Sequence, residues 1–113
     1  MAKPVIVSGI QPTGNLHIGN YLGAVKNWVD LQNSDKYQLY IFIADLHSLT
    51  GKISAANLRE QVLVTAAELL AAGIDPKKTT FFIQSQIPGH ADLAWIFNCV
   101  APMSELERMT QYK

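Results

Sequence analysis

Three short runs rich in β-branched and aromatic residues alternate with longer helical patterns along the chain, and this order restricts the possible folds. The runs span residues 4–9, 37–44 and 79–84, and the first has no polar alternation, as in a parallel strand that is covered on both faces. Strands that alternate with helices form parallel sheets through right-handed crossovers. The sequence therefore predicts an α/β fold in which three strands make about half of a doubly wound sheet.

Helical periodicity marks the segments between and after these strands. Residues 17–31, 55–72 and 91–100 are expected to be helices, with Ser54 as N-cap and Gly73 as C-cap of the second. The first carries an apolar stripe at three- and four-residue steps, made by Ile18, Leu22, Val25 and Val29. Three further side chains on these helical patterns are expected to pack in the interior, namely Trp28, Trp95 and Cys99.

Charge and cysteine content exclude several classes of protein. Lys and Arg number 9 and Asp and Glu number 9, so the sequence lacks the basic footprint of a protein that coats nucleic acid. The single cysteine excludes an intrachain disulfide, and three scattered histidines argue against a structural zinc site, so no metal site is expected. The N-terminal apolar run is shorter than the roughly 7–15 residues of a signal peptide, and no run reaches the ~20 residues of a membrane span. We therefore expect a soluble, cytoplasmic protein that does not bind membranes.

The segment after the first strand has the residues of a ligand-binding loop. Ligands of open α/β folds bind at the carboxyl ends of the strands, and residues 9–20 join the first strand to the first helix. Thr13 offers a hydroxyl, Gly19 lets a flat ring approach the first helical turn, and amides at the start of a helix favour phosphate. The segment matches neither G-x-G-x-x-G nor G-x-x-x-x-G-K-[ST]. From these residues alone, an ordinary strand-to-helix turn capped by His17 is an equally good interpretation.

Three separated segments resemble one known family. The string PTGNLHIGN, residues 12–20, resembles the HIGH signature of class I aminoacyl-tRNA synthetases, and residues 8–24 resemble the tryptophanyl branch of that family. The string ELERMTQYK, residues 105–113, is similar to a second stretch of that branch, and residues 73–76 with 80–86 are similar to a third. Because the three segments occur in the family's order, the resemblance covers the whole chain.

The resemblance implies a Rossmann-type catalytic domain. Residues 1–113 would be the N-terminal part of this nucleotide-binding domain, and the rest of it and the anticodon-binding domain would lie outside the chain. Such an enzyme uses ATP with Mg2+ to activate L-tryptophan as tryptophanyl-adenylate, transfers the tryptophanyl group to tRNA(Trp), and works as a homodimer without a prosthetic group. Catalysis would rest on positioning and on the stabilisation of phosphate charge. The 113 residues alone are expected to be inactive or very weak, because the lysine-rich KMSKS signature and the family's indole-binding aspartate do not occur in them.

The resemblance also assigns roles to residues by their positions. The residues expected to act in catalysis are Gln11, Thr13, Asn20 and Lys113, and those expected to contact ATP are Gln11, Pro12, Thr13, His17, Gly19 and Asn20. The residues expected to border tryptophan are Val7, Gln11, Asp45 and His47. Structural interpretations stay open for five of these residues: a helix cap for His17 and for Asp45, a core residue for Val7, a loop residue for His47 and a solvated side chain for Lys113.

Two other functions stay open at this point. A tyrosyl-type synthetase or a nucleotidyltransferase of the same superfamily would share the loop, although Gln11, Asn20 and residues 108–113 disfavour both. A non-catalytic module that binds a nucleotide or a partner subunit would account for the absence of the lysine-rich signature.

Overall fold

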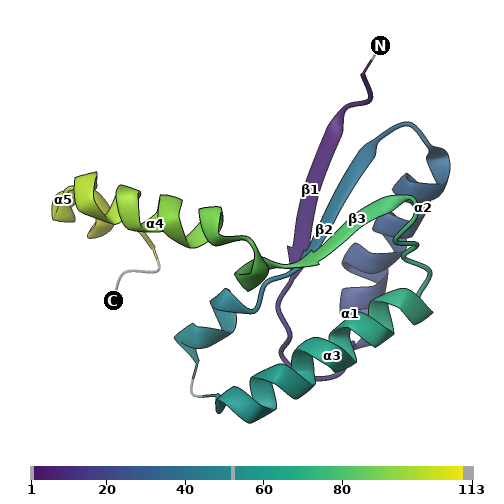
Figure 1. Cartoon of the computed structure of the whole chain (residues 1–113), viewed down its shortest axis with the longest axis horizontal. Coiled ribbons are helices and arrows are strands. Elements are labelled where there is room, and N and C mark those ends of the chain that lie inside the picture. Colours follow the sequence, from purple (N-terminus) through teal and green to yellow (C-terminus); the bar gives the residue numbers. More distant parts are fainter. Residues whose placement is uncertain (1, 52, 111–113) are drawn as a thin grey trace.

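The three expected strands form one parallel sheet in the order β1-β2-β3 (Figure 1). The computed structural model describes residues 2–51 and 53–110. The strands are β1 (Val5–Ile10), β2 (Gln38–Ile43) and β3 (Thr79–Ile83), each within about a residue of the expected bounds. The α/β fold predicted from the alternating pattern is therefore confirmed.

Helical connections link the strands in sequence. Between β1 and β2 lie α1 (Ile18–Asn20), the π-helical turn η1 (Tyr21–Val25) and α2 (Lys26–Ser34). Between β2 and β3 lie the 3-10 helix η2 (Leu46–Thr50) and α3 (Ala55–Ala71). The expected caps of α3 are present: the Ser54 hydroxyl accepts from the Asn57 amide at 3.2 Å, and Gly73 follows the helix with φ of 111°.

The hydrophobic core lies between one face of the sheet and the helices α2 and α3. Alternate residues of β2 point to this face, so β2 contributes Ile41 and Ile43, both 0% exposed. The helices and the α3–β3 connection contribute the rest of the cluster, namely Val25, Trp28, Val62, Leu69 and Ile74. Because α2 and α3 pack against the same two strand residues, both crossovers cover the same face of the sheet.

The opposite face of the sheet is more open than the sequence predicts. Val7 of β1 is 62% exposed, so the expectation that the first strand is covered on both faces is wrong for the described residues. On this face the Phe42 and Phe82 rings stack at a centroid distance of 5.5 Å. A Cβ atom on Gly9 would lie 2.8 Å from the Phe42 ring, so glycine is required where that ring crosses β1.

The first helical segment differs from its predicted pattern. Ile18 is 71% exposed and Leu22 is also exposed, whereas Trp28 is 6% exposed. Ile18 lies in α1 and Leu22 in the π-helical turn η1, ahead of the part of this helical segment that packs on the core, which begins at Ala24 and Val25. The interior positions of Trp28 and Val25 are confirmed, Val29 packs against the core, and the predicted burial of Ile18 and Leu22 is wrong for the described structure.

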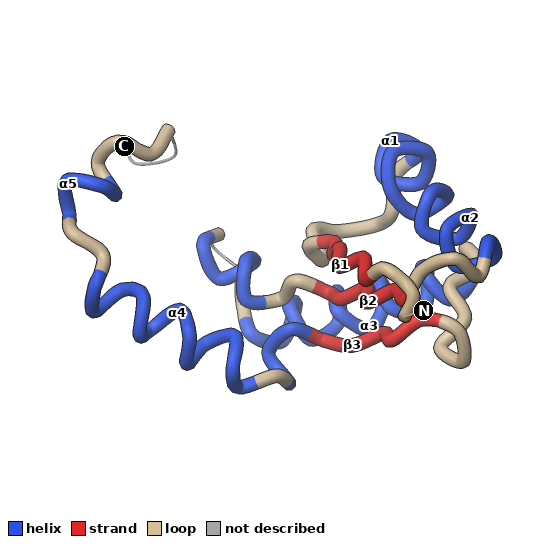
Figure 2. The backbone as a smooth tube through the Cα atoms, turned by 90° about the horizontal axis from the view of Figure 1, so that it is seen from above, coloured by secondary structure: helices blue, strands red, loops and turns tan. Residues whose placement is uncertain are grey.

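The C-terminal elements lead away from the sheet. After the 3-10 turn η3 (Gln84–Gln86), α4 (Pro88–Val100) and α5 (Met103–Leu106) extend to one side in both views (Figures 1 and 2). Helix α4 begins three residues earlier than predicted because proline is favoured in the first turn. Trp95 and Cys99 are exposed on α4, so their expected interior positions are wrong within the described part of the chain.

Candidate functional site

The loop between β1 and α1, residues 11–17, is called the first loop below. It begins with a tight turn in which the Thr13 amide donates to the Gln11 carbonyl at 3.0 Å. Pro12 is buried inside this turn, and Gly14 has φ of 106°, a conformation that favours glycine. Gln11 and Thr13 are exposed, so their side chains are open to a ligand at the carboxyl end of β1.

His17 ends the first loop and caps α1. Its Nδ1 atom accepts from the amides of Gly19 at 3.1 Å and Asn20 at 3.3 Å. This arrangement requires the proton on Nε2, which leaves the Nε2–H group as a donor. A Cβ atom on Gly19 would lie 3.0 Å from Cε1 of the His17 ring. The flat ring that approaches Gly19 in this structure is therefore the imidazole of His17, as in the helix-cap interpretation.

Glu68 of α3 binds the first loop from a distant part of the sequence. Both carboxylate oxygens of Glu68 accept from the Leu16 amide, each at 3.1 Å, across 52 residues. The contact is partly buried, and Leu16 also packs against the hydrophobic core. Glu68 is not among the residues predicted from the sequence, although α3 carries a signal that could have identified it.

That signal is a polar stripe along α3. Asn57, Gln61, Thr65 and Glu68 follow one another at steps of four, four and three residues, so they share one face of the helix. Thr65 and Glu68 line a small cavity of about 40 Å³ against the first loop, together with Thr13 and Asn20 among others. The stripe therefore faces the loop, while neighbouring apolar residues of α3 face the sheet.

Asn57 and Gln61, the other two residues of the stripe, line a larger cleft, which is called the polar cleft. It measures about 390 Å³ and is lined by Gln11, Pro12, Thr13, Ser48, Gly51, Ile53, Asn57 and Gln61. The Ser48 hydroxyl and the Gln61 side-chain carbonyl are shielded from solvent, and neither has a hydrogen-bond partner among the described residues. The cleft places Gln11 and Thr13 beside neutral polar groups from two other elements.

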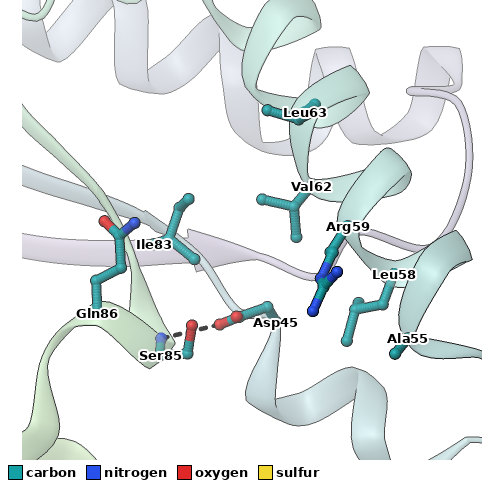
Figure 3. Close-up of a pocket in the computed structure, with 9 residues that line it drawn as sticks. All are labelled: Asp45, Ala55, Leu58, Arg59, Val62, Leu63, Ile83, Ser85 and Gln86. Atoms are coloured by element: carbon teal, nitrogen blue, oxygen red, sulfur yellow. Dashed lines mark hydrogen bonds between the residues drawn. The ribbon is translucent and has the colours of Figure 1, made fainter.

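Asp45 follows β2 and lines a separate, mainly apolar pocket (Figure 3). The pocket measures about 490 Å³ and includes Leu58, Val62 and Ile83. Asp45 is 9% exposed, and its Oδ1 atom accepts from the amides of Leu46 at 3.1 Å and Ser85 at 3.0 Å. The carboxylate thus caps η2 and connects the carboxyl ends of β2 and β3.

The four residues expected to border tryptophan do not share a pocket in the described structure. Gln11 lines the polar cleft and Asp45 lines the apolar pocket. Val7 lies on the open face of the sheet, and His47 is exposed in η2. Lys113, expected to reach the triphosphate, lies outside the described residues.

A buried polar network ties α2 to β3 at the opposite end of the sheet. The Gln32 side-chain amide donates to the Gly73 carbonyl at 3.0 Å. Its carbonyl oxygen accepts from the Asp75 amide at 2.8 Å and from the Thr79 hydroxyl at 2.9 Å. These bonds satisfy Gln32, which is 6% exposed, and they fix the start of β3 relative to α2.

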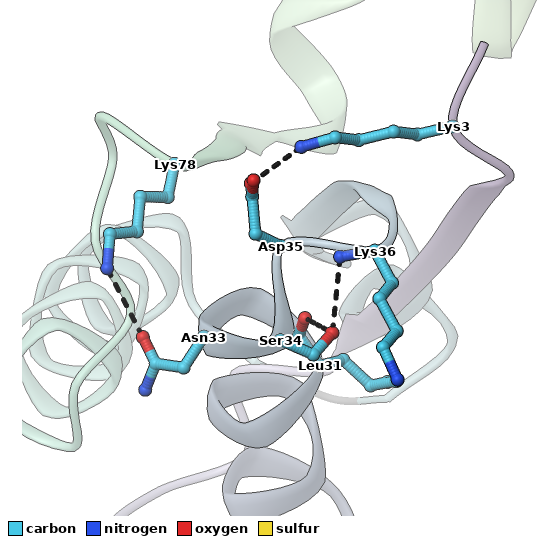
Figure 4. Close-up of polar contacts among 7 residues, drawn as sticks. All are labelled: Lys3, Leu31, Asn33, Ser34, Asp35, Lys36 and Lys78. Atoms are coloured by element: carbon cyan, nitrogen blue, oxygen red, sulfur yellow. Dashed lines mark hydrogen bonds and ion pairs between the residues drawn. The ribbon is translucent and has the colours of Figure 1, made fainter. Parts of the chain in front are cut away.

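Exposed contacts surround the same end of the sheet (Figure 4). Lys3 pairs with Asp35 at 2.6 Å, and this hydrogen bond lowers the pKa of the Asp35 carboxyl below its ordinary value. Lys78 donates to Asn33 at 3.4 Å. Since these side chains are on the surface, we interpret them as solvated structural contacts.

No group of three or more His, Cys, Asp or Glu side chains within residues 2–51 and 53–110 could hold a metal ion. None of the helices described there is long and apolar enough to cross a bilayer.

Comparison with known families identifies the class to which this sheet and loop belong. The model of the family "tRNA synthetases class I (W and Y)" matches residues 1–113. The chain therefore belongs to the class I tRNA synthetases of the W and Y type.

The similar proteins described here are tryptophan–tRNA ligases. The tryptophan–tRNA ligase of Clostridium acetobutylicum is 54% identical over 111 residues, which is 98% of this chain and 32% of the relative. That of Rickettsia bellii is 50% identical over 111 residues, which is 98% of this chain and 33% of the relative. The chain thus spans about a third of the length of the curated relatives that it matches.

Solved structures agree with this relationship. The tryptophanyl-tRNA synthetase of Campylobacter jejuni matches with a TM-score of 0.87 and 40% identity over 98% of this chain and 34% of that chain. The same enzyme complexed with ADP and tryptophan matches with a TM-score of 0.84 and 41% identity, over 92% of this chain and 32% of that one. These matches confirm the expected Rossmann-type fold.

Proposed function

We propose that the protein carrying this chain activates L-tryptophan with ATP and transfers the tryptophanyl group to tRNA(Trp). The observation that carries the proposal is the match of the whole chain to tryptophan–tRNA ligases, at up to 54% identity among the relatives described above. A similar structure complexed with ADP and tryptophan supports the same two ligand classes. Residues 1–113 would then form the N-terminal part of the catalytic nucleotide-binding domain.

The first loop would hold the reacting phosphates. Activation is an in-line attack of the tryptophan carboxylate on the α-phosphorus of ATP, and pyrophosphate leaves. The side chains of Gln11 and Thr13, which are exposed on either side of the buried Pro12, would face ATP. Asn20, close to the same loop, would donate to a phosphate oxygen. Donors placed in this way lower the barrier by positioning and by stabilising charge.

The geometry of His17 and Gly19 refines their proposed roles. Because Nδ1 of His17 accepts from the Gly19 and Asn20 amides, only the Nε2–H group is available to ATP. Gly19 would contribute by leaving room for the His17 ring as well as for the nucleotide. Lys113, placed by the resemblance alone, would reach the triphosphate from the C-terminal end of the chain.

Val7, Gln11, Asp45 and His47 remain the residues proposed to border tryptophan. Gln11 would lie between the two substrates, since it lines the polar cleft beside the first loop. Mg2+ would enter with ATP as part of the substrate. Assembly as a homodimer and a cytoplasmic location complete the proposal, and both rest on the family resemblance.

Amino-acid-dependent exchange of pyrophosphate into ATP tests the proposed function directly. With the natural gene product that carries this chain, we expect exchange that depends on tryptophan and not on tyrosine, followed by charging of tRNA(Trp). If tyrosine supported the exchange and tryptophan did not, the proposed amino-acid substrate would be tyrosine instead of tryptophan. Nucleotide binding without exchange would favour a non-catalytic module.

The isolated chain offers a second test. Residues 1–113 expressed alone are expected to show little or no exchange, because one face of the sheet is open and the outer edge of β1 is unpaired in the described structure. Exchange at the rate of the natural protein would contradict this expectation.

A further inference from the structure

Leu16 is the residue through which α3 is bonded to the first loop. The Leu16 amide lies between Gly14, whose φ is 106°, and His17, which caps α1. Among the described residues its hydrogen-bond partner is the Glu68 carboxylate, whose two oxygens each accept at 3.1 Å. This bond therefore fixes the loop immediately before the residue that sets the start of α1.

The chemistry of this contact suits a positioning role. A hydrogen bond to a charged acceptor is stronger than one between neutral groups, and Glu68 projects from the last turn of the 17-residue helix α3. That helix packs on the sheet through buried residues such as Val62 and Leu69. The loop is thus tied to a helix that packs on the hydrophobic core.

A carboxylate beside this loop also has a cost if ATP binds there. Negative charge repels a triphosphate, and the small cavity lined by Glu68 includes Thr13 and Asn20. Two effects therefore oppose each other: the hydrogen bond orders the loop, and the charge disfavours the phosphates. Both oxygens accept from the Leu16 amide, so the carboxylate is bonded to the loop backbone.

We propose that Glu68 is a positioning residue for ATP binding, which acts through the Leu16 amide to hold the first loop in the shape that accepts the triphosphate. The kinetic test of this inference rests on the proposed function, whereas the hydrogen-exchange test does not. Glu68 itself does not touch the reacting atoms. Its role is to keep Leu16, and through it the His17 cap, in place before ATP arrives.

Three variants of the natural protein separate the hydrogen bond from the charge. Glu68→Leu removes the acceptor and the charge, and Glu68→Gln removes the charge but keeps an acceptor oxygen. Glu60→Leu is the matched control, because Glu60 lies on the same helix, is exposed and makes no hydrogen bond among the described side-chain contacts.

Two readouts test the proposal. Loss of a charge-assisted hydrogen bond corresponds to about a tenfold change in a local equilibrium. We therefore expect Glu68→Leu to lower the protection of the Leu16 amide against hydrogen exchange about tenfold. In tryptophan-dependent exchange, its KM for ATP should rise by up to about tenfold while its KM for tryptophan changes by less than about twofold. Glu68→Gln should recover most of both effects, and Glu60→Leu should match the unsubstituted protein.

Each contrary result has a defined meaning. Unchanged protection of Leu16 in Glu68→Leu overturns the proposal, as does an equal rise in both KM values together with a lower unfolding temperature. A KM for ATP in Glu68→Gln below that of the unsubstituted protein would show that charge repulsion outweighs positioning, and it too overturns the proposal. Absence of tryptophan-dependent exchange in the unsubstituted protein overturns the proposed function, whereas the amide protection still tests the contact with Leu16.

Discussion

Replacement of Gln32 by leucine should destabilise the fold without creating a cavity. The side chain makes three hydrogen bonds, to the Gly73 carbonyl, the Asp75 amide and the Thr79 hydroxyl, at 2.8–3.0 Å. Gln32 is 6% exposed and Thr79 is 1% exposed, so water cannot replace the lost partners easily. At about 1 kcal/mol for each bond, Gln32→Leu should lower the free energy of unfolding by about 3 kcal/mol.

Urea denaturation of the natural protein, combined with hydrogen exchange at the Asp75 amide, measures this loss both globally and locally. Asn33→Leu is the matched control, since Asn33 is the next residue of α2, is exposed, and accepts a hydrogen bond from exposed Lys78 at 3.4 Å. Its effect should stay within about 0.5 kcal/mol. If Gln32→Leu also fell within that range, the network would contribute nothing net and the reasoning would be refuted.

Three further perturbations test other contacts. His17→Ala removes the cap of α1 and should cost about 1 kcal/mol of stability, seen as a lower thermal midpoint that His17→Asn largely restores; equal midpoints for the three proteins would exclude the cap. Gln61→Leu replaces a shielded carbonyl that has no partner among the described residues, so calorimetry should show an equal or higher midpoint, and a clearly lower one would show that the carbonyl is paired. Lys3→Ala should return the lowered pKa of Asp35 towards its ordinary value in an NMR titration, with no shift counting against the ion pair. The stabilisation from that pair is present above the ordinary pKa of the carboxyl and is lost as the pH falls through the lowered value.

The strands and caps were predictable because they depend on local chemistry. β-Branched and aromatic runs gave the bounds of β2 to within a residue, and Ser54 and Gly73 act at the ends of α3 as their side-chain and backbone preferences require. The class of fold follows from the order of such elements. None of these predictions required knowledge of contacts between distant residues.

The remaining features depend on contacts that periodicity does not encode. The first helical segment contains the π-helical turn η1, which no single residue type in Tyr21–Val25 predicts, and its Ile18 and Leu22 are exposed in the described structure. Trp95 and Cys99 were expected inside because their neighbours are apolar, yet α4 has no buried residue in the described structure. An apolar helical face predicts that something covers it, and it does not say which part of a protein does so.

The candidate site was predictable in part. The first loop was located by its place after β1 and by its resemblance to a family signature. The contributions of α3 were missed, because Gln61 and Glu68 are ordinary residues for an exposed helix face. Only their spacing with Asn57 and Thr65 distinguishes them. That spacing becomes informative once the fold is known, because the fold places the stripe against the first loop.

Helix α3 also couples two properties that are usually measured apart. One face of the helix packs on the sheet, and the adjacent face holds the first loop through Glu68. Binding that orders the loop must then also stabilise the helix against unfolding, by about 2.7 kcal/mol when the ligand concentration is 100 times its Kd. By the same linkage, a substitution at Leu69 that loosens α3 would weaken that binding without touching the ligand. The unfolding of this sheet and the binding of a ligand to the loop are therefore linked equilibria, so that a change in one shifts the other.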